Sequence, residues 1–398
     1  MRFALVPLLL LAATAATIAN ADTLVVLPFA NLSRTSNLDW IGEGIADDIR
    51  ETAAAEGLIA LERTDRNEAY KRLGIRQNVL LTRASVIKIA EALDAEQVVY
   101  GEFEFLPSPP TTTTTRGTLK LTGHVLDLKS LRQGPEFSEL GALEDLAGIQ
   151  TRVSWRALHY LQPSGAPPLE EFLKTRPNIR LDALEFYVRG LVAPHAEVKH
   201  RYFTNAIRID PQYSRVYYRL GQLHFEKEEY KLALDAFSKV NLRDAHSRKS
   251  EFLAGICRFH TNDFTGAQTA FERVAKDVPL SEVINNIGVT QARRNLAESI
   301  EMLRKALEGD PADADYRFNV GLALWRRGQF EEAAKNFEAS SARNPDDAQA
   351  KQMLARCQRK SGPRPQELLE IRERLKTSYE ETAWLQLKSM LQPLKPND

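Results

Sequence analysis

A recurring pattern of small and large apolar positions occupies the second half of the chain, from about Leu184 to Pro345. Each unit carries a glycine, then an alanine or serine, then an aromatic residue or leucine four positions further on. Because residues four apart share one face of a helix, the pattern predicts pairs of closely packed helices, with the large side chain filling the space between them. The four clearest sets are Gly221, Ala233 and Phe237; Gly255, Ala267 and Phe271; Gly288, Ser299 and Leu303; and Gly321, Ala333 and Phe337.

The unit is 34 residues long, since this number separates both Gly221 from Gly255 and Pro311 from Pro345. The proline stops the second helix, because its ring cannot continue the hydrogen-bond ladder. A single pair cannot bury its own apolar face, so the units must stack. In repeat length and anchor positions the pattern resembles the tetratricopeptide family. This resemblance implies an all-α solenoid whose first helices line a concave groove.

The two ends of the array depart from the regular unit. Residues 184–211 form a shortened first unit, as is expected of a terminal cap. Residues 348–359 supply one further first helix, which Gly362 and Pro363 end. From residue 365 to residue 391, apolar side chains at helical spacing predict an amphipathic helix that covers the last apolar face.

Residues 22–161 carry a mixed pattern that predicts an α/β domain. The apolar run at 23–29 is typical of a buried strand. Segments 97–106 and 118–128 alternate apolar and polar residues, which predicts an antiparallel hairpin around a Pro- and Thr-rich loop at 107–116. The other predicted elements are strands at 58–62 and 137–140 and helices at 65–73, 84–93 and 143–161.

A further helix is expected after Trp40, from the helical spacing of its apolar residues. We expect Asp47 and Asp48 to face outward from it. Gly42 and Gly44 weaken a helix, so they are expected to serve close packing.

Three stretches of this domain resemble the amino-terminal domain family of TolB and its relatives, which include curli-secretion and flagellar outer-membrane proteins. They are VVLPFANLS at 25–33, IGEGIADDI at 41–49 and VVYGEF at 98–103. The resemblance implies a cell-envelope protein with no catalytic site in this domain. Relatives are often fused to tetratricopeptide repeats, and the Thr-rich loop is longer than the resemblance would suggest.

The patterns together predict a multidomain chain, an N-terminal α/β domain (a mixed sheet with flanking helices) followed by an all-α tetratricopeptide-type solenoid. The expected boundaries are 1–21 for a signal peptide, 22–161 for the TolB-like domain, 162–182 for a linker, 183–360 for the repeat array and 361–398 for a C-terminal capping helix.

The first 21 residues are typical of a secretory signal peptide, with Arg2 before an apolar run and small residues at Ala19 and Ala21. The alternative is a membrane anchor, but the apolar run is short for a spanning helix. Asp22 in place of a cysteine argues against a lipoprotein anchor. We therefore expect export across the inner membrane, a periplasmic location and no membrane span after cleavage.

Charge and composition narrow the classes of partner. The chain has 398 residues, with 53 Lys and Arg balanced by 53 Asp and Glu. A formal net charge of zero gives no electrostatic footprint for nucleic acid. An apolar content of 43% rules out wholesale disorder.

The sequence offers little catalytic chemistry. It contains no HExxH, CxxC, GxSxG or P-loop motif. Cys257 and His260 share a predicted helix, but zinc normally takes three or four ligands and no second pair stands nearby. Cys257 and Cys357 occupy equivalent positions three units apart, too far for a disulfide. We expect no catalytic residue, no metal and no cofactor.

The informative surface is the inner face of the predicted groove. Asn286 and Asn319 share one inward position of two successive units, and Arg293 and Arg326 share another. An amide offers the donor and acceptor that a peptide backbone needs, and arginine suits a carboxylate. The resemblance to tetratricopeptide repeats implies backbone binding by such asparagines. The alternative is that they cap or bridge helices while the arginines are solvated. The other groove residues expected to bind a partner are aromatic: Tyr218, Phe225, Phe252, Phe259 and Trp325.

These features favour a non-enzymatic interaction scaffold, with a peptide or protein in the groove and the α/β domain docked to an envelope assembly. Two alternatives stay open. One is a structural ring component of a secretion or motility assembly, and the other is an envelope hydrolase with a site between the domains. A groove filled by the protein's own C-terminal residues would rule out the scaffold.

Overall fold

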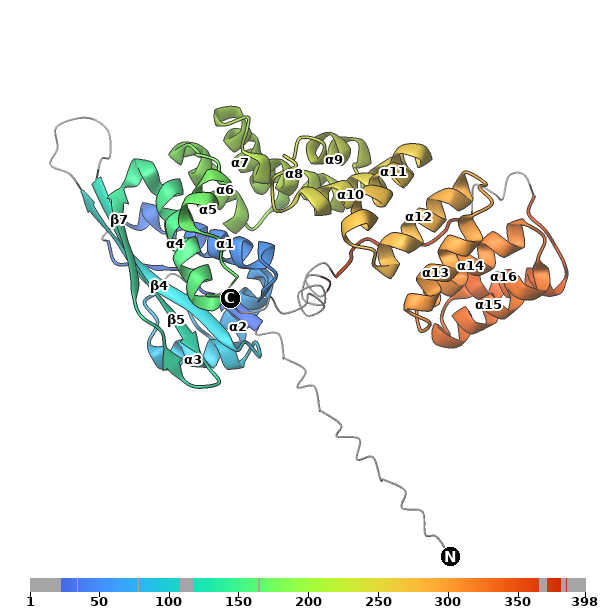
Figure 1. The fold of residues 1–398 in the computed structure, drawn as a ribbon, viewed down its shortest axis with the longest axis horizontal. Coiled ribbons are helices and arrows are strands. Elements are labelled where there is room, and N and C mark those ends of the chain that lie inside the picture. The colour runs from blue at the N-terminus through green and yellow to red at the C-terminus, as the bar shows by residue number, and fades with distance from the viewer. Residues whose placement is uncertain are drawn as a thin grey trace, which may run out of the picture.

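The structure is a computed structural model that describes residues 23–33, 35–77, 79–107, 117–163, 165–364, 371–380 and 384. The expected signal peptide and residues 108–116 of the Thr-rich loop lie outside this described part. Figure 1 shows an α/β domain at one end, from which an array of helices extends.

A mixed sheet forms the centre of the α/β domain. The strands run in the order β3-β1-β4-β5-β6, with β2 also paired to β4 and β7 to β5. β1 is parallel to β3 and β4, whereas β4 and β5 form the long antiparallel hairpin expected from their alternating residues. The strands are β1 Thr23–Val26, β2 Ala30–Asn31, β3 Ile59–Ala60, β4 Gln97–Pro107, β5 Gly117–Asp127, β6 Arg132–Gln133 and β7 Phe137–Ala142.

Helices cover both faces of this sheet. On one face α1 and α4 bury Ile41 and Val153 against strand residues such as Phe103. On the other face, α2 and α3 pack residues such as Ile89 against Val98. The helices are α1 Trp40–Ala55, α2 Arg63–Leu73, α3 Arg83–Glu91 and α4 Leu146–Leu161, with short 3-10 turns at Ser36–Leu38 and Leu143–Asp145.

Gly42 allows α1 to approach the backbone of Phe29, which follows β1. The Phe29 amide donates to the Gly42 carbonyl at 3.2 Å. A Cβ atom at position 42 would lie 1.9 Å from the Phe29 carbonyl oxygen. Gly44 is also crowded, since an added Cβ would meet Val188 at 2.9 Å. The expected role of both glycines in close packing is confirmed.

We expect Gly42→Ala to lower the free energy of unfolding by about 1–3 kcal/mol or more, because the backbone must shift to admit the methyl group. Urea unfolding measures the effect. Gly362→Ala is the matched control, since its added Cβ would meet nothing closer than 3.7 Å. Equal midpoints for the two variants would contradict the packing argument.

The repeat array is a stack of helical hairpins. Each glycine faces the large residue predicted to fill the space beside it: added Cβ atoms at Gly221, Gly255, Gly288 and Gly321 would meet Phe237, Phe271, Leu303 and Phe337 at 2.5, 2.8, 2.7 and 3.1 Å. The helices are α6 Leu181–Val192, α7 Ala196–Ile209, α8 Ser214–Glu226, α9 Tyr230–Phe237, α10 Ser247–His260, α11 Phe264–Asp277, α12 Ser281–Arg293, α13 Ser299–Gly309, α14 Ala314–Arg326, α15 Phe330–Arg343 and α16 Ala348–Gln358.

The α/β domain and the first repeats share one hydrophobic core. Tyr187 and Val188 of α6 belong to the same buried cluster as Ile45 of α1. The stretch expected to be a linker contains α5, Leu169–Lys174, and its Phe172 is buried in that cluster. The region between the domains is therefore packed and does not act as a free spacer.

The expectation that Asp47 and Asp48 face solvent is wrong. Asp47 is only 7% exposed and accepts a 2.9 Å hydrogen bond from the Tyr187 hydroxyl. Asp48 pairs with Arg215 of α8 at 3.2 Å. Helical spacing identified the apolar face of α1, but it could not show that α6 and α8 cover the polar face.

Candidate functional site

The groove of the array holds the protein's own C-terminal residues. Residues 371–380, which we call the tail, follow α16 in sequence but run back along the first helices α14 and α12 toward α10. In Figure 1 the tail is the red coil that passes α12. Ile371–Glu380 contain no helix, so the capping helix expected over 365–391 is wrong for these residues. Most of the other residues of that stretch lie outside the described part.

Two asparagines bind the tail through its backbone. The Asn319 side chain accepts from the Arg374 amide at 2.8 Å and donates to the Arg374 carbonyl at 2.8 Å. Asn286 does the same for Lys376, at 2.8 and 2.9 Å. Both amides are fully buried. Each asparagine thus satisfies the N–H and the C=O of one residue, the chemistry anticipated for a peptide backbone.

Asn285 joins these two contacts into one network. Its amide donates to the Arg374 carbonyl at 3.1 Å and to Asn286 at 3.2 Å, and its oxygen accepts from Asn319 at 2.8 Å. The asparagines therefore bridge α12 and α14 as well as holding the tail. The alternative that these asparagines bridge helices is therefore correct, and the same amides also hold an extended backbone.

Arginines enclose the carboxylate of the tail. Glu373 has a side chain that is 1% exposed, and it pairs with both Arg293, at 2.6 Å, and Arg326. Both arginines also donate to the Ile371 carbonyl, at 3.4 and 3.1 Å. Burial lowers the pKa of Arg293, although Glu373 opposes this shift. The predicted pairing of these arginines with a carboxylate exists within the chain.

Acidic side chains on the opposite rim hold the basic residues of the tail. Arg374 pairs with Asp315 at 3.1 Å and with Asp347 at 2.6 Å. Lys376 reaches Asp313 at 2.7 Å and Asp315 at 2.9 Å. Burial alone would raise the pKa of Asp315, but the hydrogen bonds and charges of Lys376 and Arg374 hold it below its usual range. The groove is therefore acidic on one rim and basic on the other.

The aromatic half of the expected groove is largely packed against neighbours. Tyr218 stacks on His246 with ring centroids 4.1 Å apart, and Phe225 meets Tyr230 edge-on. Phe252 meets Tyr379 of the tail at 4.8 Å. Phe259 is 7% exposed and lies against Phe264. Binding of a partner by these residues stays a prediction.

Trp325 does not line the groove. The side chain is fully buried, its Nε1 donates to the Ser361 carbonyl at 2.8 Å, and the Arg356 guanidinium lies 4.6 Å from its ring centre. Its inward position faces residues that follow α16, which sequence periodicity does not reveal. The expectation that Trp325 meets a partner is thereby corrected.

Several groove residues escaped the sequence prediction. Asn285 and Phe318 directly precede Asn286 and Asn319, and Asp315 lies four residues before Asn319, which places it on the same face of the helix. Extending the inner face to these neighbours would have found all three. Asp313 and Asp347 precede their helices as caps, and their second role depends on where the tail lies.

Space remains beside the tail. A cavity of about 400 Å³ is lined by Phe225, Phe252 and Tyr379 among others, and one of about 750 Å³ by Phe259, Arg293 and others.

The cysteine and the histidine that share a helix, Cys257 and His260, each pack against other parts of the protein. Cys257 is buried, which raises the pKa of its thiol to about 12, and His260 stacks on Tyr230 at 4.2 Å.

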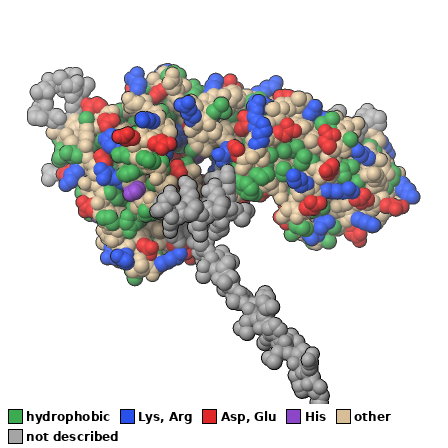
Figure 2. Space-filling view, viewed as in Figure 1, with side chains coloured by type: hydrophobic (Ala, Val, Ile, Leu, Met, Phe, Trp, Pro, Cys, Tyr) green, Lys and Arg blue, Asp and Glu red, His purple; other side chains and the backbone are tan. Residues whose placement is uncertain are grey.

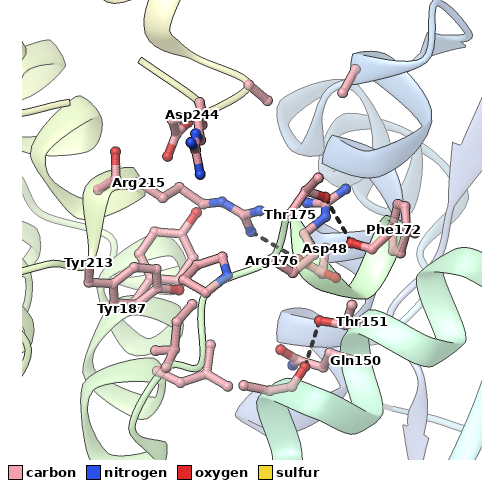
Figure 3. Close-up of a pocket in the computed structure, with 18 of the residues that line it drawn as sticks. Asp48, Gln150, Thr151, Phe172, Thr175, Arg176, Tyr187, Tyr213, Arg215 and Asp244 are labelled. Carbon is pink, nitrogen blue, oxygen red and sulfur yellow. Dashed lines mark hydrogen bonds and ion pairs between the residues drawn. The ribbon is translucent and has the colours of Figure 1, made fainter. Parts of the chain in front are cut away.

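A third cavity, of about 300 Å³, lies between the domains, against α1, α4, α5, α6 and α8 (Figure 3). Arg215 extends across it to Asp48, which also accepts from Ser154 at 2.8 Å. Arg176 donates to Thr52 at 3.1 Å. These contacts join α1 to α4, α8 and the residue that follows α5, so they tie the two domains together.

Two features are absent from the part of the chain that the structure describes. No group of three or more His, Cys, Asp or Glu side chains there is arranged to hold a metal ion. Within the same residues, every helix is too short or too polar to cross a membrane. Figure 2 shows acidic and basic side chains interspersed over the visible face of the molecule.

Comparison with known proteins identifies the repeats. Sequence models of the tetratricopeptide repeat match residues 214–246 and residues 291–357. The array is therefore a solenoid of tetratricopeptide repeats, as its 34-residue period predicted. No curated protein sequence matches the chain.

Solved structures with similar arrays include MamA, in a crystal structure that is 18% identical over 39% of this chain and 91% of its own, with a TM-score of 0.35. Another is YrrB, described as a TPR protein with an unusual peptide-binding site. It is 20% identical over 48% of this chain and 94% of its own, with a TM-score of 0.33. A third is MamA from Desulfovibrio magneticus RS-1. It is 19% identical over 42% of this chain and 95% of its own, with a TM-score of 0.38.

Proposed function

We propose that this protein is a non-enzymatic, periplasmic interaction scaffold whose repeat array binds an extended segment of a partner protein. The observation that carries the proposal is the pairing of Asn286 and Asn319 with both backbone groups of single tail residues. Such bonds require an extended chain but no particular side chain, so a partner segment can form them equally well.

The tail and a partner segment would occupy the same place in the groove. A partner reaches the asparagines only when the tail has left them, so its apparent affinity falls in proportion to the fraction of open molecules. From the sequence alone, a groove filled by the protein's own residues would rule out a scaffold. The tail instead occupies the groove through contacts of the kind expected for a partner, which supports competition for one site.

The α/β domain is proposed to dock the scaffold to a cell-envelope assembly. This part of the proposal rests on the resemblance of residues 25–33 and 41–49 to envelope proteins and on the signal-like N-terminus. The buried contacts between α1 and α8 support a fixed arrangement, in which the docked domain would hold the groove in one orientation.

The test captures partners from cell-envelope extracts with matched baits. One bait is the unchanged chain, and another carries Arg374→Glu and Lys376→Glu, which set like charges against the acidic rim and loosen the tail. A third bait adds Asn286→Ala to the second. We expect the loosened bait to recover more of a partner than the unchanged chain, by about tenfold or more if the tail is docked at least nine-tenths of the time. The third bait is expected to lose it.

The control bait carries Lys351→Glu and Arg359→Glu, which change the net charge equally on the exposed side of α16 and past its end. It should behave like the unchanged chain. Thermal unfolding by circular dichroism checks that every bait keeps its helices. Recovery of the same proteins in the same amounts by all baits would refute the groove as the binding site.

A further inference from the structure

The tail shows the register in which the groove takes an extended chain. Asn286 and Asn319 occupy equivalent positions of neighbouring repeats, here 33 residues apart. They hold tail residues that are two apart. Two residues of extended chain span about 7 Å and return the side chain to the same side. Each repeat therefore receives two residues of ligand, and neighbouring ligand side chains meet opposite rims.

The basic rim selects an acidic side chain. Glu373 is enclosed by Arg293 and Arg326, and its side chain is almost completely removed from water. A neutral or basic side chain at this place would take away the buried carboxylate that both guanidinium groups contact. Removing one partner of a buried ion pair is strongly unfavourable, so the pair of arginines selects against such side chains.

The acidic rim selects basic side chains one and three residues later. Arg374 lies over the Phe318 ring, 3.7 Å from its centre, and Lys376 lies 4.9 Å from the centre of Tyr316. Aromatic faces attract cations, and the carboxylates of Asp313 and Asp315 complete each contact. The two subsites thus combine charge with an aromatic floor.

Apolar contacts replace the backbone contacts toward α10. At the inward position that carries an asparagine in α12 and α14, α10 carries Leu253. There the tail packs Tyr379 against Phe252, and Leu375 lies against the same hydrophobic cluster. The groove therefore ends in an aromatic subsite six residues after the acidic one.

We propose that residues 371–379 are an internal copy of the groove's ligand. The partner then presents an extended segment with an acidic side chain, basic side chains one and three residues after it, and an aromatic side chain six residues after it. This inference rests on the proposed function and adds the chemistry of the partner to it.

The probe that tests the inference is a fluorescent synthetic peptide of residues 371–379, titrated in fluorescence anisotropy. We expect saturable binding to the full chain loosened by Arg374→Glu and Lys376→Glu. The unchanged chain should bind at least tenfold more weakly, because its own tail competes. A peptide with Glu373→Arg should bind the loosened chain about 30-fold or more weakly, since it sets a cation against both arginines.

A charge exchange keeps the test independent of folding defects. The loosened chain with Arg326→Glu should lose the unchanged peptide and gain the Glu373→Arg peptide. Lack of binding by any peptide, or equal binding of both peptides to both grooves, overturns the inference.

The two proposals fail separately. Charge-selective peptide binding, with no partner captured through the groove from extracts, would leave the ligand chemistry intact and remove the scaffold function. A partner that is captured through Asn286 while the peptides show no charge preference would do the reverse.

Discussion

Glu51→Ala is expected to lower the free energy of unfolding by about 3–5 kcal/mol, because it removes a buried carboxylate that the buried guanidinium groups of Arg50 and Arg219 contact. Glu51 is 4% exposed and contacts Arg50, Arg219 at 3.1 Å and His246 at 2.9 Å. After the substitution, Asp47 at 3.9 Å is the one carboxylate among the described residues that Arg219 still contacts, beside its 3.1 Å hydrogen bond to Gln222. Glu51 lies on α1, and its partners include residues of α8 and of the loop before α10. The substitution therefore also weakens the contact between the two domains.

Urea unfolding followed by circular dichroism measures this effect. Asp182→Ala is the matched control, because it removes the exposed Arg180–Asp182 pair, whose side chains are 65% and 48% exposed. Surface pairs contribute about 0–1 kcal/mol, so this variant should unfold close to the unchanged chain. A Glu51→Ala chain as stable as the Asp182→Ala chain would contradict the structural role of the network.

Lowering the pH should remove the difference in the free energy of unfolding between the Glu51→Ala variant and the unchanged chain. Burial alone would raise the pKa of Glu51, but Arg50, His246 and Arg219 outweigh burial and hold it well below its usual range. A carboxyl group with a depressed pKa stabilises the fold above its unfolded-state pKa of about 4.3, and this contribution is lost as the pH falls through the folded-state pKa. The stability gap should therefore be full at pH 7 and shrink below about pH 4.

Asn286→Ala combined with Asn319→Ala is expected to release the tail from the groove. Asn286→Ala removes the buried partner of both the N–H and the C=O of Lys376. Asn319→Ala removes the partner of the Arg374 N–H, whereas the Arg374 carbonyl keeps its bond from Asn285. Each lost buried partner costs about 1–3 kcal/mol. Hydrogen exchange at the Arg374 and Lys376 amides should accelerate about 30-fold or more.

The control for this release is Asn336→Ala, since Asn336 lies on the second helix α15 and donates to Glu332 within that helix, away from the described residues of the tail. It should leave exchange at both tail amides unchanged. Exchange that stays slow in the double variant would mean that the ion pairs of Glu373, Arg374 and Lys376 hold the tail without the asparagines.

Local rules predicted the helical hairpins and the chemistry of the groove. The pairing of Gly288 with Leu303 follows from spacing within one unit, because the fold of a repeat is set by short-range contacts. The donor and acceptor of Asn286 were likewise evident from its type and its inward position. These features need no knowledge of distant parts of the chain.

The failures share one cause, which is contact between segments far apart in sequence. Asp47 appeared solvated because α6, some 140 residues later, was not known to cover it. Trp325 appeared available because the residues after α16 were not known to reach it. The apolar residues of the tail have helical spacing, yet Ile371–Glu380 are extended, since the groove offers partners for their backbone.

The sequence by itself determined the repeat, the direction of its inner face and the amide and guanidinium groups placed there, because all of these follow from periodicity within a few turns of helix. Only the tertiary structure decided what those groups bind. An extended segment lies along α14 and α12 because asparagines satisfy its backbone and the two charged rims match its side chains, and no periodicity encodes that match.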